Sequence, residues 1–232
     1  MRELSEHDKQ LIVGGVPESD LALFCPGLQG HDAALLDRSQ YANHGTFVSA
    51  SWTRVPGGQR AVSINGAGSY VLIPHHASLV LTNRVATFSV WIKPGTQTAD
   101  YPQVFSKYTN DSSNGYSLSM PADMGTLYWQ MFDGVENKYV VSSVALTPGV
   151  WQHLVCRKTA TKLEFYRNGT PAGDETYTVE PHDNGANLLL GAMYAGANVI
   201  RNFVGELSMP YFVWSLKTPS AIYQRQRHLF HV

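Results

Sequence analysis

Apolar and polar residues alternate without interruption from Ala86 to Pro94. The apolar members are every second residue: Phe88, Val90 and Ile92. The positions between them are polar except for Trp91. A period of two is typical of a β-strand with one buried face. We expect the second face to be neither fully buried nor plainly exposed to solvent.

Short apolar runs of the same kind recur along most of the chain. Glycine, proline and asparagine separate them, and no internal repeat or long helix interrupts the pattern. Many short strands joined by turn residues are typical of an all-β fold. The sequence therefore predicts an antiparallel jelly-roll sandwich of two curved sheets. The further strands are expected at 20–25, 61–64, 69–73, 104–107, 116–120, 126–132, 139–144, 151–157, 163–167, 188–191 and 203–214.

Two turns stand out between these strands. Asn168 and Gly169 both tolerate a positive φ, so they predict a tight hairpin after strand 163–167. The segment Asn65–Gly68 has similar chemistry and predicts a hairpin between the strands that flank it.

Two short helices are expected at the ends of the chain. Ser5 can cap a helix from Glu6 to about Val13. Thr218 as N-cap and proline at the first helical position predict a second helix that ends near Arg227.

The order of motifs resembles the laminin-G-like, concanavalin-A-like lectin/glucanase jelly-roll family. The matching segments are Asp37–Ser39, Asn43–Gly45, Ala61–Gly66, Tyr70–Pro74, Thr87–Pro94, Phe105–Lys107, Gly149–Val155, Leu163–Gly169, Leu190–Gly191 and Phe203–Leu207. The resemblance covers residues 20–227, and it implies two sheets packed face to face with loops at the rim of a concave side. We therefore expect an N-terminal arm at 1–19 and a jelly-roll domain at 20–232. Many relatives carry an acidic residue where this chain has Ser208, which weakens any transfer of a calcium site.

The composition of the chain argues against several classes of function. The 232 residues include 17 Lys and Arg against 18 Asp and Glu, so no long-range attraction to nucleic acid or to an anionic membrane is expected. The first residues are polar and lead into no apolar segment, so we expect no signal peptide, no membrane insertion and synthesis in the cytoplasm. Cys25 and Cys156 both lie in apolar contexts, which favours two buried free thiols over a disulfide.

The carboxylates do not form a catalytic pattern. Glycoside hydrolysis generally needs a pair of carboxylates at a set separation, and alternate positions of one strand could supply it. Glu164 and Glu206 each stand alone in their strands. We therefore expect no enzymatic activity. His153 lies in phase with its apolar neighbours and is expected to be a packed, hydrogen-bonded histidine rather than a catalytic one.

Ca²⁺ is the only candidate cofactor. Asp37, Asn43 and backbone carbonyls of the 37–46 loop could bind it, with Glu206 as a further ligand. The alternative, which we favour, is that Asp37 and Asn43 hydrogen-bond within their own turn.

Aromatic side chains could supply stacking surfaces for sugar rings. Alternation along strand 126–132 places Trp129 in the core, and it places Tyr128, Gln130 and Phe132 on the opposite face. Those three residues, together with Trp91, are the predicted ligand-binding set.

Two functions remain open for a non-enzymatic protein of this kind. The first is a structural component of a larger assembly, such as a capsid decoration or tail-associated protein of a virion. Its arm would dock on a protein partner or on a second copy through Leu4, Leu11 and Ile12. The second is a glycan-binding, lectin-like module. The sequence favours the first, because a virion protein needs no secretion signal.

Overall fold

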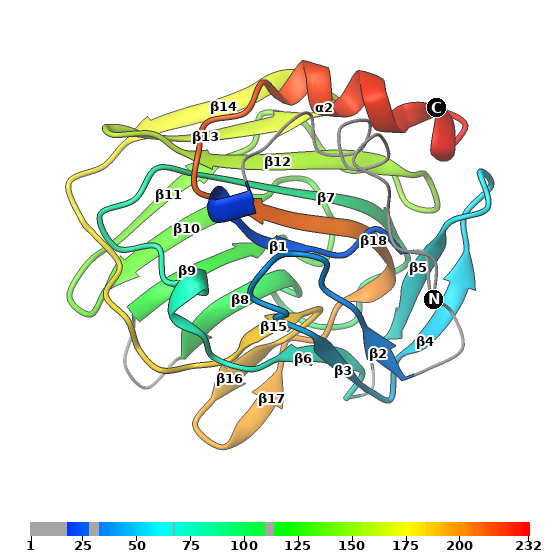
Figure 1. The fold of residues 1–232 in the computed structure, drawn as a ribbon, viewed down its shortest axis with the longest axis horizontal. Coiled ribbons are helices and arrows are strands. Elements are labelled where there is room, and N and C mark those ends of the chain that lie inside the picture. Colours follow the sequence, from blue (N-terminus) through cyan, green and yellow to red (C-terminus); the bar gives the residue numbers. More distant parts are fainter. Residues whose placement is uncertain (1–17, 28–32, 67, 110–113) are drawn as a thin grey trace.

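The structure is a computed structural model that describes residues 18–27, 33–66, 68–109 and 114–232. Two antiparallel sheets pack face to face as a sandwich (Figure 1). The expected all-β fold is therefore confirmed. The predicted helix at 6–13 and the arm contacts Leu4, Leu11 and Ile12 lie outside the described residues and stay predictions, as does the domain boundary near residue 19.

The first sheet has the strand order β14-β13-β12-β7-β18-β5-β4, and β1 pairs with β18 beside this path. Its strands are β1 (Leu21–Phe24), β4 (Ser51–Arg54), β5 (Arg60–Asn65), β7 (Ala86–Pro94), β12 (Gln152–Lys158), β13 (Lys162–Arg167), β14 (Thr170–Thr176) and β18 (Val204–Val213).

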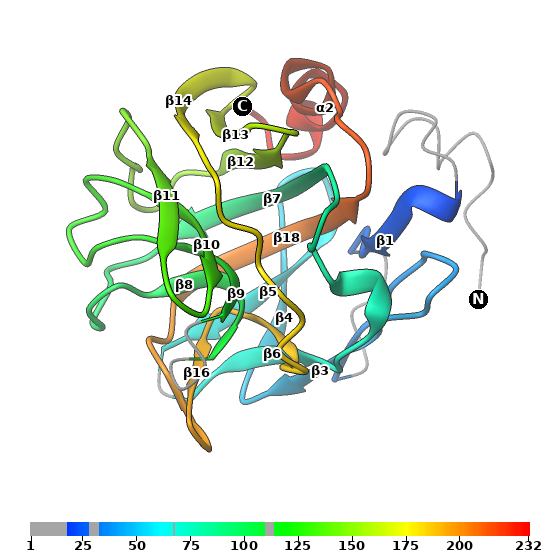
Figure 2. The same cartoon turned by 90° about the vertical axis from the view of Figure 1, so that its left-hand side faces the viewer.

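The second sheet has the order β11-β10-β9-β8-β15-β6-β3-β2, and the β16–β17 hairpin joins it at β8. Its strands are β2 (Ala34–Leu35), β3 (Gly45–Val48), β6 (Tyr70–Ile73), β8 (Gln103–Thr109), β9 (Asn114–Ser119), β10 (Tyr128–Asp133), β11 (Asn137–Val141), β15 (Leu188–Leu190), β16 (Met193–Ala195) and β17 (Asn198–Ile200). In Figure 2, β11 to β8 lie on the left of the molecule and β6 and β3 at the bottom. Short helices complete the chain: η1 (Glu18–Asp20), η2 (Ala77–Leu79), α2 (Pro219–Gln226) and η3 (Arg227–Leu229).

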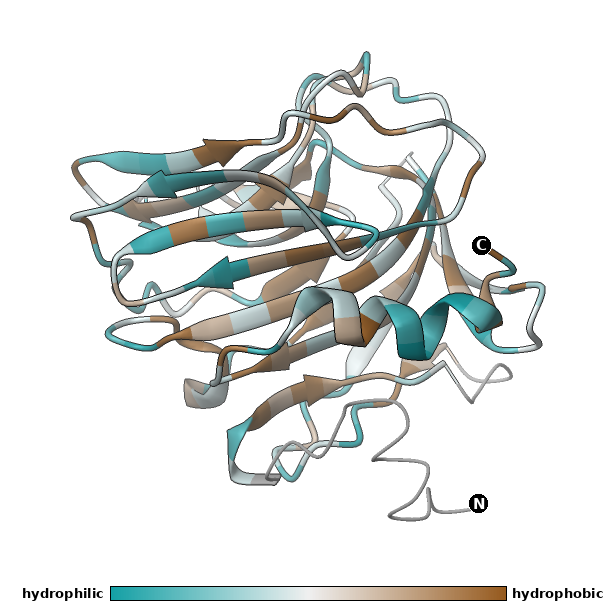
Figure 3. Ribbon diagram, turned by 90° about the horizontal axis from the view of Figure 1, so that it is seen from above, coloured by the Kyte–Doolittle hydropathy of each residue, from teal (hydrophilic) through white to brown (hydrophobic). Residues whose placement is uncertain are grey.

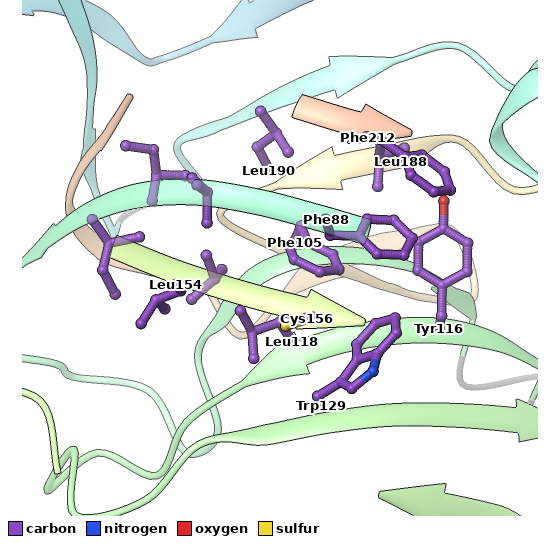
Figure 4. Packing of buried hydrophobic residues seen from close by; sticks show 14 of the residues in the cluster. Phe88, Phe105, Tyr116, Leu118, Trp129, Leu154, Cys156, Leu188, Leu190 and Phe212 are labelled. Atoms are coloured by element: carbon purple, nitrogen blue, oxygen red, sulfur yellow. The ribbon is translucent and has the colours of Figure 1, made fainter. Parts of the chain in front are cut away.

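The main core lies between the sheets and centres on Phe88 of β7 (Figure 4). Its ring stacks on Phe212 at 3.8 Å and on Phe105 at 5.3 Å. The rings of Tyr116 and Trp129 each lie 5.1 Å away. These contacts confirm that the Phe88 face of the alternating strand is the buried one, and that Trp129 belongs to the core.

The opposite face of β7 is buried as well, which corrects the expectation that it would be only partly covered. Trp91 is 0% exposed, and its ring stacks on Phe230 at 4.0 Å. Its Nε1 donates a hydrogen bond of 2.8 Å to Oε1 of Gln226. Helix α2 and the C-terminal segment therefore form a third layer over the outer face of the first sheet, and Figure 3 shows α2 lying along that side.

The predicted hairpin around Asn65–Gly68 is wrong. Strand β5 pairs with β4 and β18 in the first sheet, whereas β6 pairs with β3 and β15 in the second. Turn residues allow the chain to reverse, but they do not decide whether the next strand joins the same sheet or the facing one. The other predicted turn is confirmed, because Asn168 and Gly169 have φ values of 50° and 77° and connect β13 to β14.

Strand β18 contains a proline although it lies inside the sheet. The register with β7 shifts between Ser208 and Tyr211, and Met209 has a φ of 51°. A bulge of this kind accommodates Pro210, which cannot donate a ladder hydrogen bond. Strand β7 pairs with β18 on both sides of this bulge. The strand on the other edge of β18 is β5 before the bulge and β1 after it.

Candidate functional site

Asp37 uses both carboxylate oxygens to accept hydrogen bonds from its own turn and from β1. Oδ1 accepts hydrogen bonds from the amides of Phe24 (2.7 Å) and Ser39 (2.8 Å). Oδ2 accepts from the Ser39 hydroxyl (2.6 Å) and from the amide of Asn43 (2.7 Å). The Asn43 side chain in turn donates to the Ala22 carbonyl at 2.7 Å. Both residues are buried, and together they tie this loop to β1.

Glu206 does not join Asp37 and Asn43. It lies on β18 opposite Ser63 and forms an ion pair of 3.2 Å with Lys93. Asp37 is bonded to Phe24, which pairs with Tyr211, five positions further along β18. At about 3.3 Å per residue this separation is roughly 16 Å. Within the described part of the chain, no group of three or more His, Cys, Asp or Glu side chains could hold a metal ion.

Trp91 does not lie with the other predicted ligand-binding residues. It belongs to the first sheet, whereas Tyr128, Gln130 and Phe132 lie on β10 of the second. Because Phe230 covers its ring and the side chain is 0% exposed, Trp91 presents no stacking surface. We therefore leave it out of the candidate site.

Tyr128, Gln130 and Phe132 belong to a regular array on the outer face of the second sheet. The strand register places three positions on each of four strands in three rows. The first row is Gln103, Ser119, Tyr128 and Val141, the second is Ser106, Ser117, Gln130 and Tyr139, and the third is Tyr108, Gly115, Phe132 and Asn137. We call these twelve positions the aromatic face.

Aromatic rings gather at both ends of the aromatic face. At one end, the ring of Tyr128 lies 5.8 Å from Tyr139 and 6.0 Å from Tyr101, which precedes β8. Tyr101 and Tyr139 are 45% and 43% exposed. At the other end, Tyr108 and Phe132 lie 4.2 Å apart and are both partly exposed. Exposed rings of this kind can bury the apolar face of a ligand ring.

Along β10, Gln130 lies between Tyr128 and Phe132, and the same row holds Tyr139 on β11 and two serines on β8 and β9. Gln130 is partly exposed, and its Nε2 donates a hydrogen bond of 2.7 Å to the Ser119 hydroxyl. On β8, Oε1 of Gln103 and Oγ of Ser106 are buried and have no hydrogen-bond partner in the structure. Gln103 and Ser106 are each only 1% exposed, so these two oxygens are not open to a ligand, and the accessible polar side chains of the middle row are those of Gln130 and Tyr139.

The aromatic face carries no carboxylate. None of its twelve positions is Asp or Glu, so it lacks the acid–base pair that glycoside hydrolysis needs. A positive charge lies beside Tyr101, because the guanidinium carbon of Arg201 is 5.8 Å from the centre of the Tyr101 ring. This chemistry suits binding of an uncharged, ring-containing ligand.

The histidine and the cysteines are buried as expected. Nε2 of His153 lies 2.7 Å from the Ser89 hydroxyl, and burial lowers the pKa of His153 to about 3. Cys25 and Cys156 are buried free thiols, and burial raises the pKa of each well above its usual value. His153 and both thiols are therefore packed inside the protein, away from the aromatic face.

A family model described as the concanavalin A-like lectin/glucanases superfamily matches residues 65–213. The chain therefore belongs to this superfamily. The comparison with curated proteins gives no match.

Solved structures share the fold at low sequence identity. The binding domain of Paraclostridial Mosquitocidal Protein 1 matches with a TM-score of 0.71 and 13% identity over 91% of this chain. This chain spans about half (53%) of that structure. A structure of botulinum neurotoxin type C, whose cell entry depends on interaction with two ganglioside molecules, matches with a TM-score of 0.66 and 10% identity. It covers 91% of this chain, which spans 52% of that structure.

A third similar structure is a single domain. Domain 4 of AbnA, an extracellular arabinanase from Geobacillus stearothermophilus, was solved in complex with arabinotriose. It matches with a TM-score of 0.67 and 17% identity, over 89% of this chain and 98% of that domain. All three matches show a shared fold.

Sequence reasoning found the β10 part of the aromatic face but missed Tyr101, Tyr108 and Tyr139. Tyr139 lies in a predicted strand, so alternation indicates which residues share its face. The sequence does not indicate which residue of β10 lies opposite it. The strand expected at 104–107 ends one residue before Tyr108, whereas β8 extends to Thr109. Tyr101 joins the site only through the packing of a segment that lies outside the strands.

Proposed function

We propose that this protein is a non-enzymatic glycan-binding domain and that the aromatic face is its binding surface. The observation that carries the proposal is the array itself: accessible aromatic rings lie on both sides of Gln130 along an outer sheet face. Rings bury the apolar faces of sugars, and the polar side chains between them hydrogen-bond to hydroxyl groups. The lack of a carboxylate on this face supports binding over hydrolysis.

Similar structures support the same function. The arabinanase domain was solved in complex with arabinotriose, and cell entry of the neurotoxin depends on interaction with two ganglioside molecules. Because function lives in sites rather than in folds, these likenesses support the proposal only together with the aromatic face.

A glycan array tests the proposal directly. The wild-type chain is expected to bind a defined subset of glycans, and Tyr128→Ala is expected to lower that signal at least tenfold, because it removes the central ring of one aromatic end. Tyr70→Ala is the matched control, since this partly exposed tyrosine lies on β6 of the same sheet, outside the aromatic face. A wild-type chain that binds no glycan, or a Tyr128→Ala variant that binds like the wild type, would contradict the proposal.

The role in a larger assembly, such as a virion, is the second candidate. It rests on the nearly balanced charge and on the predicted arm contacts Leu4, Leu11 and Ile12. Light scattering on the full chain tests it, because replacement of Leu4 and Leu11 by serine would convert an arm-dependent oligomer into a monomer. A wild-type chain that is monomeric at all concentrations would contradict self-association through the arm.

A further inference from the structure

We propose that the ligand of the aromatic face is a single extended glycan chain of at least three sugar units, bound along β10 through its interior. This inference rests on the proposed function and adds the size and the direction of the ligand. A terminal monosaccharide would occupy only part of the face.

The first argument is the separation of the two aromatic ends. Tyr128 and Phe132 lie four positions apart on the same face of one strand. At about 3.3 Å per residue their backbones are roughly 13 Å apart. Rings in contact have centroids about 4.5–7 Å apart, so one sugar ring cannot rest on both ends. A third ring fits between the two terminal ones, above Gln130.

The second argument is the chemistry of the middle row. Gln130 of β10 and Tyr139 of β11 lie opposite each other in this row, both are accessible, and each side chain can both donate and accept hydrogen bonds. A central sugar unit above Gln130 would be held there by hydrogen bonds between its hydroxyl groups and these two side chains.

The third argument is the tilt of the rings around Tyr128. The planes of Tyr101 and Tyr139 make angles of 61° and 68° with the plane of Tyr128. Rings turned in this way enclose one chain from several sides and do not form a flat platform. We therefore infer that the ligand is an isolated chain rather than the flat surface of a crystalline polysaccharide.

The test is a length series measured by isothermal titration calorimetry. Oligomers of one to six units are prepared from each glycan that the array retains, with arabino-, xylo-, cello- and chito-oligosaccharides as standing probes. The affinity of the wild type is expected to rise at least tenfold from two to three units and to change less than threefold beyond four. Phe132→Leu and Tyr128→Leu, which keep apolar bulk, are each expected to remove the gain from the third unit, and Tyr70→Leu is the control.

Each outcome separates the two proposals. If a monosaccharide binds the wild type as tightly as the hexamer does, the extended-chain inference is overturned while glycan binding stands. The same holds if both leucine variants keep the gain from the third unit. If the array retains no glycan and no standing probe binds, both proposals fail. The wild-type series does not depend on the folding of any variant, so it decides the inference by itself.

Discussion

Asp37 and His153 are buried polar side chains that the fold keeps in different ways. Asp37 accepts three hydrogen bonds from Ser39 and Asn43 of its own turn, so the turn follows from local sequence chemistry, and it accepts a fourth from the amide of Phe24 on β1. His153 is held by Ser89, a residue 64 positions away in the chain. The turn of Asp37 was therefore accessible to sequence reasoning, whereas the partner of His153 depends on the pairing of β7 with β12.

His153 makes the stability of the protein depend on pH. Its pKa is about 3 in the folded protein, against an ordinary value of 6.5 in the unfolded chain. Above pH 6.5 both states are neutral. Below it only the unfolded chain takes up the proton, so stability falls by about 1.4 kcal/mol per pH unit until the pH approaches 3.

Replacement of His153 by glutamine is expected to remove this contribution. Urea denaturation at pH 7 and at pH 5 is the measurement, and the wild type is expected to lose about 2 kcal/mol more between these values than the variant does. His228→Gln serves as the control, because that histidine is exposed. Equal losses in wild type and His153→Gln would show that His153 is not buried in its neutral form.

At the scale of elements, the turn between β13 and β14 supports helix α2. A Cβ atom added at Gly169 would lie 2.9 Å from Cα of Ser220 and 3.2 Å from Cβ of Tyr223. The hairpin itself was predicted correctly from Asn168 and Gly169, because its geometry is local. Helix α2 was predicted as well, but its contact with the turn was not. Nothing in the sequence of either segment indicates which other segment it packs against.

Two glycine-to-alanine variants separate backbone strain from packing at this turn. Gly169 and Gly149 have φ values of 77° and 71°, but a Cβ at Gly149 would meet no atom within 4 Å. Gly149→Ala is therefore expected to cost about 1–2 kcal/mol from strain alone. Gly169→Ala is expected to cost a further 1–3 kcal/mol, because it also pushes against α2. Chemical denaturation measures both, and equal losses would mean that α2 does not rest on the turn.

At the scale of the whole molecule, the first sheet lies between the second sheet and the C-terminal layer, and its strands contact both. Along β7, Phe88 faces the second sheet, whereas Trp91 faces the C-terminal layer. Alternation in the sequence revealed the two faces of this strand. It did not reveal the cover over Trp91, because Phe230 lies 139 positions further along the chain and its local sequence does not indicate where it packs. The sequence also does not show which strands belong to which sheet, because strand pairing joins segments that lie far apart in the chain. The strands on either side of Asn65–Gly68 belong to different sheets.

The shared strands predict that the C-terminal layer unfolds together with the sandwich. Phe230→Ala removes a buried ring that stacks on Trp91 at 4.0 Å, and it is expected to lower the free energy of unfolding by about 3–5 kcal/mol. Val232→Ala, at a residue that is 41% exposed two positions away, is expected to change it by less than about 0.5 kcal/mol. Tryptophan fluorescence and far-ultraviolet circular dichroism should follow one coincident transition in both variants, because β7, β12 and β18 cannot lose the outer layer without exposing Trp91, Trp151 and Tyr211. An early fluorescence change that leaves the circular dichroism of the sheets intact would instead mean that the C-terminal layer detaches by itself.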